Sequence, residues 1–230
     1  MRFDVITGLP KLLESPFQES ILKRAQSKGF VELVVHDLRD YAHDKHQVID
    51  DTPYGGGAGM ILKPEPIFEC VEKLKAERSY DEIVFMTADG ERFDQSIATQ
   101  LSLSKNVILL CGHYKGIDER VREALITREI SIGDYVLTGG ELAAAVVVDA
   151  VVRLLPGVLN DGESALTDSF QDGLLGGPQY TKPSDFRGMR VPDVLMSGNH
   201  TQIALWREQQ RVDRTKIRRS DMLGHGQHEC

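Results

Sequence analysis

The sequence predicts an α/β fold in which a parallel sheet carries helices on both faces, followed by a small α-helical C-terminal domain. Short apolar runs alternate with longer amphipathic stretches up to Leu154, and this alternation is typical of parallel sheets. Two of the runs, EIVFMT and NVILLC, are almost entirely apolar, as strands buried on both faces are. The segment from Pro156 to Pro183 is rich in Gly, Pro, Asp and Ser and separates this part from a helical one.

Five strands follow from runs of β-branched and apolar residues, which have the sequences RFDVIT, VELVVH, EIVFMT, NVILLC and LITREI. The intervening stretches repeat apolar residues at helical spacing. Helices are therefore expected over residues 18–28, 64–77, 95–102, 118–124 and 141–154.

The glycine- and proline-rich segment also sets the domain boundaries. We expect an α/β domain over residues 1–158, a flexible linker over 159–178 and a helical domain over 179–230. In the last of these, Asn199 is suited to cap a helix that runs to Arg211, and a second helix is expected from Arg214 to Leu223. The tail GHGQHEC is expected to be disordered rather than to bind a metal.

The composition places the chain in the cytoplasm. No apolar stretch reaches the roughly 18 residues that a membrane span needs. Asp4, Lys11 and Glu14 interrupt the N-terminal segment where a signal peptide requires an apolar block. The three cysteines show neither metal nor disulfide spacing, which favours a reducing compartment.

The charge distribution leaves two readings of a basic segment open. A formal net charge of −8 argues against nucleic acid as a partner, because phosphate binding rests on Lys and Arg. Between Ile203 and Arg219, however, six basic residues stand against two acidic ones. From Glu129 to Asp172 the balance is reversed, with Arg153 as the one basic residue. An RNA-facing patch and a solvated helix face both explain the basic segment.

Three consecutive strands each end in a glycine-containing turn, with the sequences ADGE, GHYKGID and SIGDYVLTGGE. Ligands of open parallel sheets bind beyond the carboxyl ends of the strands, and glycine lets the backbone approach a ligand closely. Neither the G-x-G-x-x-G fingerprint nor a P-loop is present, which argues against a dinucleotide enzyme or an NTPase. The turns therefore predict a different small-molecule site.

A further glycine-rich block, DDTPYGGGAGM, lies at residues 50–60. It reads either as a flexible surface loop or as a backbone nest that holds a flat base or a phosphate.

Together with CGHYKGIDER, SIGDYVLTGGELAA, DSFQDGLL, PQYTKP and VLMSGNHTQIALWR, this block resembles the bacterial tRNA (guanine-N1)-methyltransferases, which modify guanosine at position 37. The resemblance runs from the first strand to about Leu223. It implies a SPOUT-class domain with a deep trefoil knot, S-adenosylmethionine as cofactor, and a homodimer whose active sites lie at the interface. The implied substrate is a tRNA with guanosine at positions 36 and 37.

Carried over by position, the resemblance assigns the cofactor site to the three glycine turns. The implied residues are Phe85, Met86, Thr87, Gly112, Tyr114, Gly116, Ile132, Gly133, Asp134, Tyr135, Val136, Leu137, Gly139 and Gly140. Backbone amides and carbonyls would read the adenine edge while apolar side chains cover its faces. For Val136 and Leu137, ordinary core packing is an equally good reading.

The resemblance also implies a catalytic pair. Ring nitrogen 1 of guanine carries a proton, so a base must remove it while a cation or donor stabilises the charge on the adjacent oxygen. Asp168 is implied as the base and Arg153 as the stabilising cation. The alternative reading of Asp168 is the N-cap of a short helix over 169–174, and that of Arg153 is a cation that complements a helix dipole.

For tRNA contacts, the resemblance points to the glycine-rich block and the C-terminal basic helix, namely to His46, Asp50, Gly55, Gly56, Gly57, Arg211 and Arg214. Asn199, His200 and Trp206 are implied as structural anchors of the C-terminal domain.

Three positions depart from the family pattern. His113 and Lys115 replace an arginine and a glutamate, and Gly176 replaces an acidic residue. The glutamate is associated with magnesium dependence, so Lys115 leaves a magnesium requirement open, and no metal ligand is assigned. Two other functions are compatible with the residues: a knotted methyltransferase for rRNA or a ribose hydroxyl, and a non-catalytic RNA-binding dimer.

Overall fold

The computed structural model describes residues 1–159 and 168–223. The chain divides into two compact units, Met1–Asn160 and Asp161–Cys230. The expected disorder of the tail falls on residues 224–230, which lie outside the described residues, as does part of the expected linker.

The first unit is built on a five-stranded sheet in which every neighbouring pair is parallel, as predicted. The strand order is β2-β1-β6-β5-β7. The strands are β1 (Arg2–Thr7), β2 (Glu32–Asp37), β5 (Glu82–Arg92), β6 (Asn106–Cys111) and β7 (Arg128–Ser131). The central strands β1 and β6 are almost entirely buried, because both faces of the sheet are covered.

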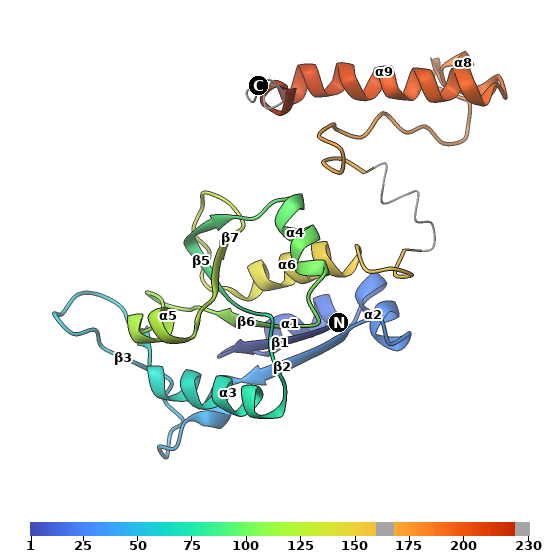
Figure 1. The fold of residues 1–230 in the computed structure, drawn as a ribbon. Helices are drawn as coiled ribbons and strands as arrows, with labels where there is room; N and C mark the ends of the chain where they lie inside the picture. Colours follow the sequence, from blue (N-terminus) through green and yellow to red (C-terminus); the bar gives the residue numbers. More distant parts are fainter. Residues whose placement is uncertain (160–167, 224–230) are drawn as a thin grey trace, which may run out of the picture. The chain divides into compact units, whose positions relative to one another are not determined.

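Helices cover both faces of this sheet (Figure 1). One face packs against α1, α2, α4 and α6, around a core that includes Phe3, Val147 and Val151. The other packs against α3, α5 and η1, around Ile6 and Ile108. The bounds are α1 (Lys11–Phe17), α2 (Ser20–Ser27), η1 (Leu38–Tyr41), α3 (Pro64–Glu77), α4 (Gln95–Ser102), α5 (Glu119–Leu125) and α6 (Glu141–Val152).

Most predicted elements of this unit are confirmed, and the differences have local causes. Helices α3 and α4 have the predicted bounds. The prediction missed α1, because Pro16 lies inside it and proline disfavours helix interiors. The last strand begins at Arg128 rather than at Leu125, since α5 continues to Leu125.

Strand β5 is longer than predicted because it contains a bulge. Its pairing with β7 shifts between Met86 and Glu91, so that β5 resumes pairing after an interruption. Gly90 allows this, because a Cβ atom there would lie 2.6 Å from the backbone of Ile130. The bulge lies at the carboxyl end of the sheet, where the site is expected.

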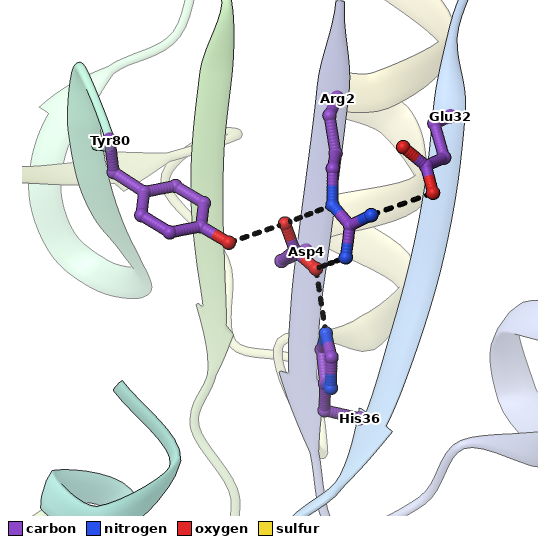
Figure 2. Close-up of polar contacts among 5 residues, drawn as sticks. All are labelled: Arg2, Asp4, Glu32, His36 and Tyr80. Carbon is purple, nitrogen blue, oxygen red and sulfur yellow. Dashed lines mark hydrogen bonds and ion pairs between the residues drawn. The ribbon is translucent and has the colours of Figure 1, made fainter. Parts of the chain in front are cut away.

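A buried polar cluster ties β1 to β2 beneath the α3 face (Figure 2). The Asp4 carboxylate, which is fully buried, accepts hydrogen bonds from Arg2 at 2.7 Å, from Tyr80 at 2.8 Å and pairs with His36 at 2.7 Å. Burial alone would raise the pKa of Asp4, but these hydrogen bonds together outweigh it and hold the pKa well below its usual range. These contacts of Asp4 link β1 to β2 through His36, and to Tyr80.

The longest element among the described residues of the second unit is helix α9 (His200–Arg218). The unit also contains a short hairpin of β8 (Asp185–Phe186) and β9 (Met189–Arg190), then α8 (Asp193–Met196), α9 and η2 (Ser220–Leu223). Asn199 caps α9 as predicted, since its side chain accepts a hydrogen bond from the Gln202 amide at 3.2 Å. The prediction of two helices here is wrong, because α9 continues without a break to Arg218.

Among the described residues, no helix is both long and apolar enough to cross a membrane. Within the same residues, no group of three or more His, Cys, Asp and Glu side chains is arranged to hold a metal ion.

Candidate functional site

A pocket lies at the carboxyl ends of β5, β6 and β7, where the glycine turns predict a site. All the residues that the resemblance implies for the cofactor line this pocket except Asp134, which is exposed on the loop after β7. The cavity measures about 200 Å³. Most small-molecule sites measure roughly 300–1,000 Å³, so a nucleoside-sized ligand would extend over the residues at its mouth.

Glycine is required where the loop after β7 meets the end of β6. The Gly140 amide donates to the Gly112 carbonyl at 2.8 Å, and His113 pairs with Gly139 as an isolated bridge. A Cβ atom at Gly140 would lie 2.9 Å from Cys111 Cα and 3.0 Å from the Gly112 nitrogen. Any side chain at Gly140 would therefore push the two turns apart.

The loop after β7 exposes apolar side chains at the mouth of the pocket. Val136 is 86% exposed, Tyr135 55% and Leu137 38%. The core-packing reading of Val136 is therefore wrong for this chain. Exposed apolar groups beside a cavity are typical of surfaces that a ligand or partner covers.

Sequence reasoning missed several lining residues, because their place depends on tertiary contacts rather than on a local pattern. They are Ala88, Ile130, Ser131, Thr138 and Ala143. His113 and Lys115, noted above only as departures, also line the pocket. The Nδ1 atom of His113 is buried and has no hydrogen-bond partner among the described residues. A buried polar atom without a protein partner is open to a hydrogen bond with a water or with a ligand group.

The glycine-rich block forms the loop of a hairpin whose strands are β3 (Asp50–Asp51) and β4 (Ile61–Leu62). The Lys115 amide donates to the Met60 carbonyl at 3.1 Å, which attaches the hairpin to the turn after β6. Burial and the neighbouring Asp50 carboxylate raise the pKa of the Tyr114 phenol. Asp50 therefore lies beside the pocket.

The other residues of this region that are predicted to contact tRNA are exposed at the surface. Gly55, Gly56 and Gly57 all have positive φ angles, and no atom would contact a Cβ added to any of them. His46 is exposed, and its amide donates to Asp44 Oδ1 at 2.9 Å. Residues 55–57 of the loop thus present backbone without side chains, as a nest for a base or phosphate would.

The predicted catalytic pair lies in different units. Arg153 is the C-cap residue of α6, in the first unit. Asp168 belongs to the second unit, and the segment 169–174 after it forms turns and bends. The reading of Asp168 as the cap of a helix at 169–174 is therefore wrong.

The segment after Asp168 is held on helix α9. Thr215, which is fully buried, accepts a hydrogen bond from the Leu175 amide at 2.9 Å. Arg211 pairs with Asp172, and Arg214 donates to the Gly176 carbonyl at 3.2 Å. Both arginines thus have partners within the unit, and their contact with tRNA phosphates stays a prediction.

The comparisons with known proteins agree with one another. The family model described as tRNA (Guanine-1)-methyltransferase TrmD matches residues 1–225. Relatives named tRNA (guanine-N(1)-)-methyltransferase include one from Cytophaga hutchinsonii, 62% identical over 222 residues that cover 96% of this chain and 94% of the relative. One from Bacteroides thetaiotaomicron is 59% identical over 223 residues, 97% and 99% of the two chains. One from Chlorobaculum tepidum is 57% identical over 224 residues, 97% of each. The chain therefore belongs to the tRNA (guanine-N1)-methyltransferase family.

Proposed function

We propose that this chain methylates ring nitrogen 1 of guanosine 37 in tRNA, with S-adenosylmethionine as the methyl donor. Family membership carries the enzyme class and the tRNA guanine substrate. The observation that supports the site is the pocket at the carboxyl ends of three parallel strands, bounded by the turns that the resemblance implies.

The residues that line the pocket are compatible with S-adenosylmethionine. Gly112, Gly139 and Gly140 carry no side chain where the two turns meet, which lets a flat base approach the backbone of the pocket wall closely. Ile132 and Leu137 offer apolar contact to the faces of the base. The buried Nδ1 of His113 offers one further polar contact. When bound, the cofactor supplies an electrophilic methyl group.

The residues of this chain supply a base for the guanine proton and a cation that stabilises the charge on the guanine oxygen. When guanine nitrogen 1 takes the methyl group, Asp168 would accept the proton that this nitrogen carries. The Arg153 guanidinium stabilises the negative charge that shifts onto the adjacent guanine oxygen. An ordinary aspartate, with a pKa of about 3.9, is a weak base for this proton, so the reaction requires a site from which water is excluded.

We infer a homodimer with active sites at the interface. The support is an apolar surface on the first unit formed by Leu9, Leu12, Leu142 and Val146, each between 37% and 53% exposed. Leu12 and Leu142 lie on helices α1 and α6, which pack against each other. A second subunit would cover this surface and bring its own Asp168 to the pocket of the first.

The trefoil knot is also proposed rather than observed. Its support is the path of the chain after β7. The loop at 132–140 approaches the end of β6, and α6 then packs against β1 and β6.

We propose that the loop at Gly55–Gly57 recognises guanosine 36 and 37 of the tRNA.

A cytoplasmic location is also proposed, and the free thiols of Cys70 and Cys111 support it. A magnesium requirement stays open, because Lys115 places a cation in the pocket wall.

Transfer of tritium from labelled S-adenosylmethionine tests the proposal. A tRNA transcript with guanosine at positions 36 and 37 should be labelled on guanine nitrogen 1, and the same transcript with adenosine at 37 should not. Labelling of rRNA or of a ribose hydroxyl instead would establish the alternative methyltransferase function. No heat on titration with S-adenosylmethionine would favour the non-catalytic RNA-binding dimer.

A further inference from the structure

We propose that Arg122 is a positioning residue for the cofactor, which holds two walls of the pocket in place without lining the pocket itself. The walls are the β5 bulge, which consists of residues 87–90, and the ring of Phe85. The inference rests on the proposed function, because it takes the pocket at the ends of β5, β6 and β7 to be the S-adenosylmethionine site. Arg122 lies on helix α5 and is absent from the lining of the pocket.

The β5 bulge interrupts the pairing of β5 with β7. Met86 and Glu91 both pair with Ile130, so the register skips the residues between them. Two of the skipped residues, Thr87 and Ala88, line the pocket. The position of this wall therefore depends on contacts other than the strand ladder.

The Arg122 guanidinium connects the bulge to β7. Its Nη2 atom donates to Asp89 Oδ2 at 3.0 Å and to Glu129 Oε2 at 2.5 Å, and its Nε atom donates to Glu129 Oε1 at 2.9 Å. The contact with Glu129 is bidentate, which fixes the plane of the guanidinium. A third carboxylate, that of Glu119, lies further off at 3.8 Å. Arg122 thus joins the bulge to the neighbouring strand by side-chain contacts where the ladder does not.

Asp89 extends this link to the lining of the pocket. Thr87 donates a hydrogen bond to Asp89, so Thr87, Asp89 and Arg122 form a continuous chain of contacts that begins at a lining residue. Hydrogen bonds from Thr87 and then from Arg122 lower the pKa of Asp89. At neutral pH the bulge therefore carries an ionised carboxylate, which the Arg122 guanidinium neutralises.

Arg122 also supports the turn after β6, through Phe85. The guanidinium carbon lies 5.6 Å from the centroid of the Phe85 ring, within the range of a cation–π contact. The turn lies against the same ring, because a Cβ atom at Gly112 would be 3.0 Å from Phe85 Cε2. Phe85 and Gly112 both line the pocket. One guanidinium therefore contacts the structures that form two of its walls.

Loss of the guanidinium would leave two carboxylates facing each other. Asp89 Oδ2 and Glu129 Oε2 both bond to Arg122 Nη2, so they lie within about 5.5 Å of each other, where like charges repel. This repulsion would move the bulge away from β7, since the ladder does not hold it there. The wall at Thr87 and Ala88 would be displaced, and the affinity for the cofactor would fall.

Calorimetric titration of the intact protein with S-adenosylmethionine tests this role. We expect Arg122→Gln to lower the affinity roughly tenfold, because small displacements of a preorganised site have effects of this order. Arg122→Lys should recover little, since an ammonium group makes no bidentate contact with Glu129. In methylation of tRNA, KM for S-adenosylmethionine should rise while kcat at saturating cofactor stays nearly constant. A variant that was only partly unfolded would instead lose kcat at an unchanged KM.

Asp89→Asn tests the link through the bulge. In the unmodified protein it should weaken binding of S-adenosylmethionine, because Arg122 loses its ionic partner on the bulge. In the Arg122→Gln protein it should leave the affinity unchanged or raise it, because no carboxylate of the bulge then repels Glu129. The Asp89 side chain is 63% exposed, so this variant should fold, and its effect alone decides the proposal if Arg122→Gln does not.

Arg120→Gln is the matched control, since Arg120 lies on the same helix, pairs with Asp118 at 2.8 Å and does not line the pocket. It should bind S-adenosylmethionine as the unmodified protein does, and circular dichroism should show which variants are folded. Equal affinities of Arg120→Gln and a folded Arg122→Gln, or additive losses from the Asp89 and Arg122 changes, would overturn the proposal. An unmodified protein that binds no S-adenosylmethionine would instead overturn the proposed function on which this role rests.

Discussion

The Thr7 hydroxyl donates a hydrogen bond of 2.6 Å to the Glu141 carboxyl group, across 134 residues of chain. Both side chains are buried, at 0% and 1% exposure. Thr7 ends the inner strand β1, and Glu141 begins α6 directly after the glycine pair of the pocket. This contact fixes where the loop of the pocket ends relative to the sheet.

Thr7→Val tests whether this contact supports the pocket. The substitution keeps the shape of the side chain but leaves a buried carboxyl group without its hydroxyl partner, which costs roughly 1–3 kcal/mol. We expect a lower midpoint of urea unfolding and weaker binding of S-adenosylmethionine in calorimetry. Thr7→Ser keeps the hydroxyl and should restore most of both. A valine variant with unchanged unfolding and binding would show that Glu141 needs no partner.

Asp4→Asn tests the buried polar cluster that links β1 to β2. The folded protein holds the pKa of Asp4 below its unfolded value of about 3.9, so the ionised carboxylate adds stability above that pH and loses it as the pH falls further. We expect the variant to be destabilised at pH 7 by on the order of 3 kcal/mol, because Arg2 loses its buried partner. Between about pH 5 and pH 2 the unfolding free energy of the variant should depend less on pH. A parallel pH dependence in both proteins would contradict this assignment.

Gly140→Ala tests the close approach of the two turns. The added methyl group would meet Cys111 Cα at 2.9 Å, backbone that cannot move aside as a side chain would. We expect cofactor affinity to fall about tenfold or more, since a displacement of this size disrupts preorganised binding. Gly177→Ala is the control, because its nearest atom would lie at an ordinary 3.5 Å. Equal affinities for the two variants would remove Gly140 from the proposed site.

Asp168→Asn tests the proposed base. The amide keeps the size of the side chain but accepts no proton, so kcat should fall by about 100-fold or more while calorimetric affinity for S-adenosylmethionine stays nearly constant. Asp193→Asn, an exposed carboxylate of the same unit, is the control and should retain full kcat. If the Asp168 variant turns over normally, another group removes the proton.

The sequence predicted those elements whose signals are local. Helix α4 has the predicted bounds because Asp94 caps it, accepting from the Ile97 amide at 3.0 Å. The three turns followed from glycines after apolar strands. The sequence does not predict helix α1, because two buried residues and an internal proline give too weak a repeat of apolar residues at helical spacing.

The parts of the site that the sequence did not predict depend on contacts between distant residues. The bridge from His113 to Gly139 and the bond from Thr7 to Glu141 join segments with no shared local pattern. The sequence predicts two helices in place of α9 for the same reason. The helix continues past Arg211 where residues 172–176 pack on Arg211, Arg214 and Thr215. Tertiary contacts of this kind override local propensity.

Thr215→Val tests whether α9 positions the proposed base. The Thr215 hydroxyl accepts from the Leu175 amide and donates to the Arg211 carbonyl at 2.7 Å, so it holds the segment that follows Asp168. Valine would leave the half-buried Leu175 amide without its Thr215 partner, at a cost of up to roughly 1–3 kcal/mol, and would loosen this segment. We expect kcat to fall while the affinity for S-adenosylmethionine, whose proposed site lies in the first unit, stays constant. Thr215→Ser should recover kcat, because it keeps the hydroxyl. A valine variant that is less stable but has full kcat would limit Thr215 to a structural role, since Asp168 would then keep its position without this contact.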